Sequence, residues 1–201
     1  MNAFVFPGQG SQHLGMGADL YNSDQKARQI FEDANEILGF KITDIMFGEN
    51  QEALKQTNIT QPAIYIHSMV IALIAEKIFK PNAVAGHSLG EFTALAAANY
   101  ISFEDGLRLV QKRAIAMQEA CEKNESSMAA IVGLDDKIVE DVCSESKETL
   151  VAANYNCPGQ IVISGTINAI NIACNKLTEL GAKRALVLPV RGAFHSPLMK
   201  S

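Results

Sequence analysis

Short apolar runs alternate with longer helical patterns over the first 120 residues of the chain. Two of these runs, 3–6 and 83–85, have the length of buried strands. The helical patterns repeat apolar positions with the 3.6-residue period and cover 26–38, 62–79 with Thr60 as its cap, 92–98 and 104–121. Because helices separate the strands, we expect the strands to pair in a parallel sheet.

From Met128 onward the predicted elements are shorter and more regularly spaced. Strand and helix patterns follow one another in the order β-α-β-β-α-β: 128–132, 136–144, 149–153, 160–164, 168–180 and 184–188. Turn-forming residues mark the breaks at Gly133, 156–159, Gly165 and Gly181. This order is typical of a ferredoxin-like unit. The sequence therefore predicts an α/β domain with a small α+β unit at 124–189, and residues 190–201 leave that unit again.

Composition is that of a globular protein. The chain has 201 residues, 48% of them apolar and 19% charged, which suits one or two domains with a sizeable core. Its longest apolar stretch, 69–75, is far too short to span a bilayer, and the N-terminus has no basic segment or cleavage site. We therefore expect a cytoplasmic protein without a membrane partner. The net charge of -5 argues against nucleic-acid binding.

Motifs for metals and nucleotides are weak in this chain. The cysteines form no C-x-x-C pair, so we expect no metal site and no disulfide framework, only reduced thiols at Cys121, Cys143, Cys157 and Cys174. The glycines near the N-terminus do not fall into the G-x-G-x-x-G spacing, and no G-K-[ST] follows them. A nucleotide-binding protein is therefore disfavoured.

The most informative motif is the G-x-S-x-G pentapeptide Gly86 to Gly90, which follows an apolar strand and leads into a helical pattern. In that context a serine is held on a tight elbow with its hydroxyl outward, so Ser88 is a candidate nucleophile. The backbone N–H of Leu89 would face the group that Ser88 attacks, and the glycine-rich loop 8–12 is a candidate source of a second oxyanion donor. The alternative is a simple turn serine in an α/β domain.

A serine nucleophile needs a base, and four histidines compete for that role. His195 lies in a short loop after a strand, and serine before histidine is the chain order of α/β-hydrolases. His13, His67 and His87 have settings that favour structural roles. The aspartates between serine and histidine fall in the small unit, so we expect a Ser-His dyad rather than a triad.

Arg113 is a boundary cation on the helical pattern 104–121. It sits about 75° from the centre of the apolar face, at about 100° per residue. Two interpretations remain open on this evidence. The arginine can lie along the edge of the core with its charge in water, or its guanidinium can grip a substrate carboxylate in a cleft.

Five motifs together resemble malonyl-CoA:acyl carrier protein transacylases. They are Phe6-Pro-Gly-Gln-Gly-Ser-Gln12, Gly86-His-Ser-Leu-Gly-Glu91, Arg113 with Met117-Gln118, Asn154-Tyr-Asn-Cys-Pro-Gly-Gln160 and Gly192-Ala-Phe-His-Ser-Pro197. The resemblance runs over the whole chain in order. It implies an α/β-hydrolase-like domain, here 1–123 and 190–201, which carries a ferredoxin-like subdomain at 124–189.

The resemblance also implies a mechanism and partners. Ser88 would take malonyl from malonyl-CoA and pass it to the phosphopantetheine thiol of acyl carrier protein in fatty-acid synthesis, with His195 as base and then acid. Backbone N–H groups of Gln9 and Leu89 would form the oxyanion hole, and Arg113 would bind the malonyl carboxylate, which makes acetyl a poor substrate. In the related acyltransferase domains of polyketide synthases this loop differs with the substrate, and residues 192–195 resemble the malonyl-selecting form rather than the methylmalonyl-selecting one. A monomer without a permanent cofactor is expected.

The chain departs from that family in three places. Members of the family continue beyond the position of Ser201, so one alternative function is that of an inactive fragment that binds acyl carrier protein. The other alternative is a serine thioesterase or hydrolase that uses the same dyad. The turn 124–127 stands where the family often has a glycine-rich turn, and Arg191 stands where a small residue is usual. A basic docking patch for the acidic carrier is expected at Lys176, Lys183, Arg184, Arg191 and Lys200.

Overall fold

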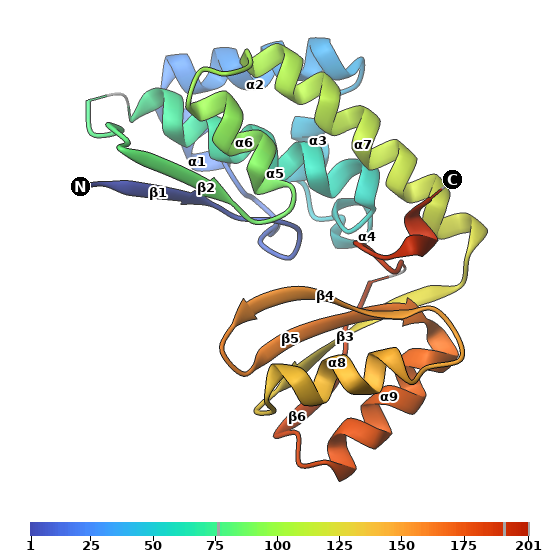
Figure 1. Cartoon of the computed structure of the whole chain (residues 1–201). Coiled ribbons are helices and arrows are strands. Elements are labelled where there is room, and N and C mark those ends of the chain that lie inside the picture. Colours follow the sequence, from blue (N-terminus) through green and yellow to red (C-terminus); the bar gives the residue numbers. More distant parts are fainter. Residues whose placement is uncertain (76, 191, 201) are drawn as a thin grey trace. The chain divides into compact units, whose positions relative to one another are not determined.

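The chain folds into two compact units, Met1–Ala116 and Met117–Ser201 (Figure 1). This computed structural model describes residues 1–75, 77–190 and 192–200. We describe each unit by itself. The long helix α7 (Phe103–Lys123) begins in the N-terminal unit and ends in the C-terminal unit.

The N-terminal unit contains a parallel pair of strands, as predicted. Strand β1 (Ala3–Phe6) pairs with β2 (Ala83–Gly86) in the register Ala3 to Ala83 through Phe6 to Gly86. The helices of this unit are α1 (Ala18–Ser23), α2 (Gln25–Leu38), α3 (Ile42–Phe47), α4 (Gln51–Leu54), α5 (Thr57–Ile74), α6 (Gly90–Ala97) and the first part of α7. The core lies around α5, against which Phe31, Ile42 and Met46 are fully buried.

The prediction for α5 was wrong at both ends. The helix begins at Thr57, so Pro62 lies inside it, and Thr60 is a buried helical residue whose hydroxyl donates to the carbonyl of Leu54 rather than a cap. It ends at Ile74 instead of residue 79. Nearly every residue from Thr57 to Val70 is buried. This burial stabilises the helical residues before Pro62, although a proline inside a helix is by itself unfavourable.

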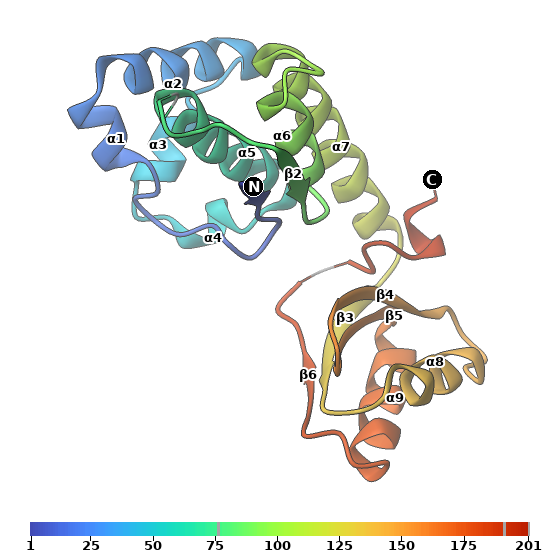
Figure 2. The ribbon, with the colours of Figure 1, turned by 60° about the vertical axis from the view of Figure 1, so that its left-hand side comes forward.

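The C-terminal unit has the predicted β-α-β-β-α-β order. Its elements are β3 (Ser126–Val132), α8 (Asp136–Ser144), β4 (Leu150–Cys157), β5 (Gln160–Thr166), α9 (Ile167–Glu179) and β6 (Arg184–Val187). The strands form an antiparallel sheet in the order β4-β5-β3-β6, and both helices cover one face of it (Figure 2). The predicted ferredoxin-like unit is therefore confirmed.

The other face of this sheet receives the end of the chain. Phe194 packs there against Met128 and Val162, and a short 3-10 helix, Pro197–Met199, follows. The assignment of 190–201 to the same domain as 1–123 stays a prediction. Across the described part of the chain, no helix is long and apolar enough to cross a membrane.

Candidate active site

Ser88 occupies a strained elbow between β2 and α6. Its φ is 53°, in the left-handed region that side chains other than glycine seldom adopt. Gly90 donates its N–H to the carbonyl of His87 at 3.0 Å and Glu91 to that of Ser88 at 3.2 Å, which starts the helix directly after the serine. The strand-turn-helix context predicted for the pentapeptide is confirmed. Strain of this kind is found at functional sites, where the surrounding structure enforces it.

The two glycines of the elbow are required by close backbone contacts. A Cβ on Gly86 would collide with the backbone of Gly90 and Glu91, and a Cβ on Gly90 would collide with the carbonyl of Phe6 and lie 3.0 Å from that of Pro7. Because backbone atoms cannot yield cheaply, side chains are excluded at both positions. The elbow is thereby pressed against the end of β1.

The glycine-rich loop that follows β1 lies against the same elbow. The N–H of His87 donates to the carbonyl of Phe6 at 3.0 Å, and a Cβ on Gly8 would lie 2.6 Å from the carbonyl oxygen of His87. Within the described residues, the backbone N–H groups of Gln9 and Leu89 donate no hydrogen bond. Two N–H groups close to the serine therefore remain available for an anionic oxygen.

Arg113 projects from α7 toward the serine. Its Nη2 donates to Ser88 Oγ at 3.0 Å and its Nη1 donates to Gln61 Oε1, while the guanidinium carbon lies 5.8 Å from the centre of the Phe92 ring. Burial lowers the pKa of Arg113, and the charge of Glu91 opposes that effect. An arginine keeps its proton at neutral pH even so. Of the two interpretations left open by the sequence, this geometry favours a guanidinium directed at the site.

Gln61 is a residue of the site that the sequence analysis did not single out. It is fully buried on α5, and it holds one arm of the Arg113 guanidinium. A buried amide needs a partner, so a glutamine inside a helix that is buried on nearly every side is a signal of a specific polar contact. That signal becomes readable only once α5 is known to begin before Pro62.

His195 lies in the C-terminal unit, in a turn between β6 and the 3-10 helix. The side chain is exposed, whereas Ala193, Phe194 and Ser196 beside it are buried. Its φ is 58°. Among the described residues three side chains other than glycine have a positive φ, namely Ser88, Asn99 and His195. Two of the three are thus the residues that the sequence analysis selected as nucleophile and base.

The other histidines have structural surroundings. His13 and His67 form an edge-to-face pair with ring centres 6.3 Å apart, and His87 packs beside Gly8. Among the described histidines, cysteines and carboxylates, no group of three is arranged to hold a metal ion.

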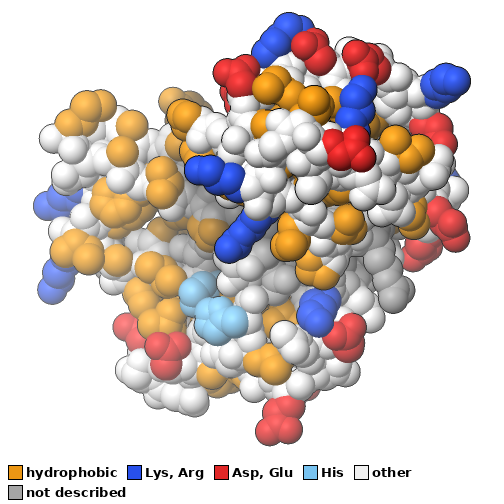
Figure 3. Space-filling model, turned by 90° about the horizontal axis from the view of Figure 1, so that it is seen from below, with side chains coloured by type: hydrophobic (Ala, Val, Ile, Leu, Met, Phe, Trp, Pro, Cys, Tyr) orange, Lys and Arg blue, Asp and Glu red, His pale blue; other side chains and the backbone are white. Residues whose placement is uncertain are grey.

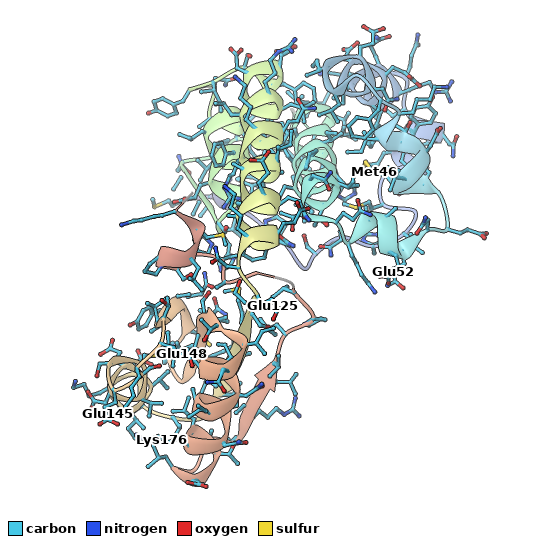
Figure 4. The ribbon with its side chains drawn as sticks, turned by 90° about the vertical axis from the view of Figure 1, so that its right-hand side faces the viewer. Met46, Glu52, Glu125, Glu145, Glu148 and Lys176 are labelled. Carbon is cyan, nitrogen blue, oxygen red and sulfur yellow. The ribbon has the colours of Figure 1, made fainter. Side chains whose placement is uncertain are left out.

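The basic docking patch expected for the acidic carrier stays a prediction. Lys176 on α9 forms an ion pair with Glu145, the residue that follows α8. Figure 4 labels both side chains, together with Glu148. The side chain of Lys183 lies over Gly133. Arg191 lies outside the described residues. On the face in Figure 3 basic side chains alternate with acidic and apolar ones.

A serine on an elbow before a helix, with a half-buried arginine at its hydroxyl, is the arrangement expected of an α/β protein with a serine nucleophile. The family model described as "Acyl transferase domain" matches residues 3–201. The chain belongs to this acyl transferase family.

Relatives and solved structures carry a more specific name. The chain is 44% identical to a "Malonyl CoA-acyl carrier protein transacylase" of Staphylococcus aureus (strain MRSA252) and 45% to that of Bacillus subtilis (strain 168), over 98% of this chain. It spans 65% and 64% of their lengths. The transacylase structure from Coxiella burnetii superposes with a TM-score of 0.94 at 40% identity, covering 98% of this chain and 64% of that one.

A second solved structure is described as a type II PKS acyl-carrier protein in complex with its malonyl-transacylase. It superposes with a TM-score of 0.93 at 39% identity, over 98% of this chain and 65% of that one. These superpositions confirm the α/β fold class with its parallel and antiparallel sheets. The predicted family resemblance is confirmed as well.

Proposed function

We propose that this chain is the part of a malonyl-CoA:acyl carrier protein transacylase that forms the malonyl-serine intermediate. The observation that carries the proposal is the hydrogen bond of 3.0 Å from the Arg113 guanidinium to Ser88 Oγ. A nucleophile with a cation beside it suits an acyl group that ends in a carboxylate, because the carboxylate can replace the hydroxyl as the partner of the guanidinium. The names of the relatives agree with this choice of substrate.

The proposed reaction has two symmetrical halves. Ser88 Oγ attacks the thioester carbonyl of malonyl-CoA, and its proton passes to the imidazole of His195. The C–S bond then breaks, and His195 returns the proton to the departing thiol of coenzyme A. In the second half the thiol of acyl carrier protein gives its proton to His195, and its sulfur attacks the carbonyl of the malonyl ester. The ester C–O bond then breaks, and His195 returns the proton to Ser88 Oγ.

Backbone N–H groups would stabilise the negative charge that develops on the substrate's carbonyl oxygen during both attacks. The N–H groups of Gln9 and Leu89 would donate to the carbonyl oxygen as it becomes an oxyanion, and the positive end of the α6 backbone favours charge at the same point. Removing one such donor from other enzymes costs about a factor of 100 to 1,000 in rate. Arg113 would select malonyl over acetyl, since an acetyl group has no carboxylate for the guanidinium to bind.

The remaining predictions belong to this proposal. We place the reaction in the cytoplasm and in a monomer, with malonyl-CoA as substrate and no permanent cofactor. The four cysteines are free thiols in the structure, which is compatible with a reducing compartment.

Intact mass spectrometry after mixing the chain with malonyl-CoA tests the proposal. We expect the mass of one malonyl group to be added to the wild type and nothing to be added to Ser88→Ala. Arg113→Lys keeps the charge but loses the two-armed contact, so the adduct should form more slowly with malonyl-CoA and at an unchanged rate with acetyl-CoA.

Two outcomes would contradict the proposal. A folded wild-type chain that acquires no adduct would show that these residues do not form the intermediate. An adduct that water removes within minutes would favour the thioesterase. Circular dichroism of each variant checks that it is folded.

A further inference from the structure

The loop that carries His195 is fastened to the antiparallel sheet by buried serine hydroxyls. Ser164 Oγ donates to the carbonyl of Phe194 at 2.7 Å, and the N–H of Ala193 donates to Ser126 Oγ at 2.9 Å. Ser164 lies on β5 and is fully buried, and Ser126 lies on β3 and is 5% exposed. Both contacts lie within the C-terminal unit.

Ser164 has no other evident reason to be a serine. The neighbouring positions of β5, Ile161, Val162 and Ile163, are buried apolar residues. A buried hydroxyl without a partner is costly, and within the described residues its one hydrogen bond goes to Phe194. An alanine would fill the same place in the sheet without the need for a partner. The serine is therefore explained by what it holds.

The bond from Ser164 acts directly on the conformation of His195. The Phe194 carbonyl and the His195 N–H belong to one planar peptide unit, so a fixed carbonyl oxygen fixes the orientation of the N–H on the other side. Rotation about the next bond is φ of His195, which is 58°. A left-handed φ at a residue other than glycine persists only where neighbouring contacts enforce it.

Further contacts hold the two peptides that precede this unit. Ser126 holds the N–H of Ala193, and the carbonyl of that residue accepts from Ser196 Oγ at 2.6 Å. The Phe194 side chain is anchored against Met128 and Val162. Met128 is the cross-strand partner of Ser164, so Ser126, two residues earlier on β3, points to the same face of the sheet. The two serines form a pair that grips consecutive parts of the loop.

We propose that Ser164 and Ser126 are positioning residues that hold His195 in its left-handed conformation. This inference rests on the proposed function, in which His195 is the base. In physical terms, the ferredoxin-like unit would act as a rigid support for the base, and the hydrogen bond from Ser164 to the Phe194 carbonyl would be its principal contact. A histidine released from that conformation would spend less time with its imidazole aligned for proton transfer.

Nuclear magnetic resonance and malonylation kinetics together test the inference. In labelled protein the Cα and Cβ chemical shifts of His195 report its φ. We expect Ser164→Ala to move both shifts away from their left-handed values, and Ser126→Ala to move them less. At saturating malonyl-CoA the malonylation rate of Ser164→Ala should fall by about tenfold or more, with an unchanged KM, because binding groups are untouched.

Ser127 provides the matched control. It is the next residue of β3, it is 7% exposed, and the alternation of side chains places it on the opposite face of the sheet. Ser127→Ala should leave both the His195 shifts and the rate unchanged. Ser164→Thr keeps a hydroxyl and should restore the His195 shifts toward those of the wild type.

The two proposals fail in different ways. Unchanged His195 shifts in a folded Ser164→Ala protein would overturn the positioning role. Equal effects of Ser127→Ala and Ser164→Ala would also overturn it, since a general loss of packing would then explain both. A wild-type chain that does not malonylate would refute the proposed function, whereas the chemical shifts would still decide what Ser164 does.

Discussion

Ser88 combines a strained backbone with the position of the proposed nucleophile. A left-handed conformation costs an ordinary residue about 1–2 kcal/mol, whereas glycine adopts it freely. We therefore expect Ser88→Gly to be more stable than Ser88→Ala by about 1 kcal/mol, although neither can form the intermediate. Urea denaturation of the two variants, compared through their midpoints at equal slope, measures this difference.

Asn99 supplies a comparison for this prediction. Its φ is 61°, and asparagine tolerates the left-handed region better than serine does. Asn99→Gly should therefore gain less stability over the wild-type asparagine than Ser88→Gly gains over the wild-type serine. If Ser88→Gly and Ser88→Ala unfold at the same urea concentration, the elbow stores no appreciable strain.

Gln61 is predicted to act on substrate choice through Arg113. Its side-chain oxygen accepts from one arm of the guanidinium, so Gln61→Leu removes that acceptor and leaves a side chain of similar length. The freed guanidinium should align less well with a carboxylate. We expect kcat/KM with malonyl-CoA to fall by about tenfold, in the range of a lost charged hydrogen bond, and kcat/KM with acetyl-CoA to stay constant. Steady-state kinetics with both thioesters provide the measurement, and an equal loss with both would contradict it.

The sequence was sufficient to select the candidate site residues, but not to predict the contacts between them. Ser88 could be selected because G-x-S-x-G has a mechanical meaning wherever a strand precedes it and a helix follows. Arg113 could only be placed at the edge of an apolar face, since no pattern tells whether such a side chain points outward or inward. Gln61 and Ser164 escaped because each is a buried polar residue whose partner is remote in the chain, 52 and 30 residues away.

At the scale of elements, period and length decided which predictions held. Helix α8 was predicted to the residue because its apolar positions recur regularly, and in the structure the side chain of Asp135 caps it by accepting from the N–H of Lys137. The helices α1, α3 and α4 were missed because they have 6, 6 and 4 residues, too few to show a period. Strand β4 runs to Cys157 through the predicted break, and only Pro158 and Gly159 form the turn.

The contact between α5 and the loop before α1 should make stability depend on pH. Burial lowers the pKa of His67, and the nearby His13 lowers it further, while Asp19 acts in the opposite direction. A histidine whose pKa is lower in the folded state stabilises the fold above its unfolded pKa of about 6.5, and that contribution is lost as pH falls. Thermal stability should therefore decline as the pH is lowered below about 6.5.

Replacement of the histidine separates this effect from general acid denaturation. His67→Gln cannot acquire the proton, so its melting temperature should fall less than that of the wild type between about pH 7 and pH 5. His13→Gln removes one unfavourable charge and should lie between the two. Differential scanning calorimetry at several pH values gives the comparison, and parallel curves for wild type and His67→Gln would refute it.

At the scale of the whole molecule, each unit has a buried cluster of its own. Phe31 on α2 belongs to the cluster around α5, and Ile163 on β5 belongs to the cluster between the antiparallel sheet and its helices. Both side chains are fully buried. Truncation of such a side chain to alanine costs about 2–5 kcal/mol. Two cores of this kind allow the units to lose protection from hydrogen exchange separately.

We expect Ile163→Ala to raise amide exchange in β3, β5 and α9 while α2 and α5 keep their protection, and Phe31→Ala to do the reverse. Hydrogen exchange followed by mass spectrometry resolves these segments. Ile172→Ala is a suitable control because that side chain on α9 is 59% exposed and should change little. If either core variant raises exchange equally in both units, the chain unfolds as one cooperative body, and a defect in the support of His195 would then also weaken the elbow that carries Ser88.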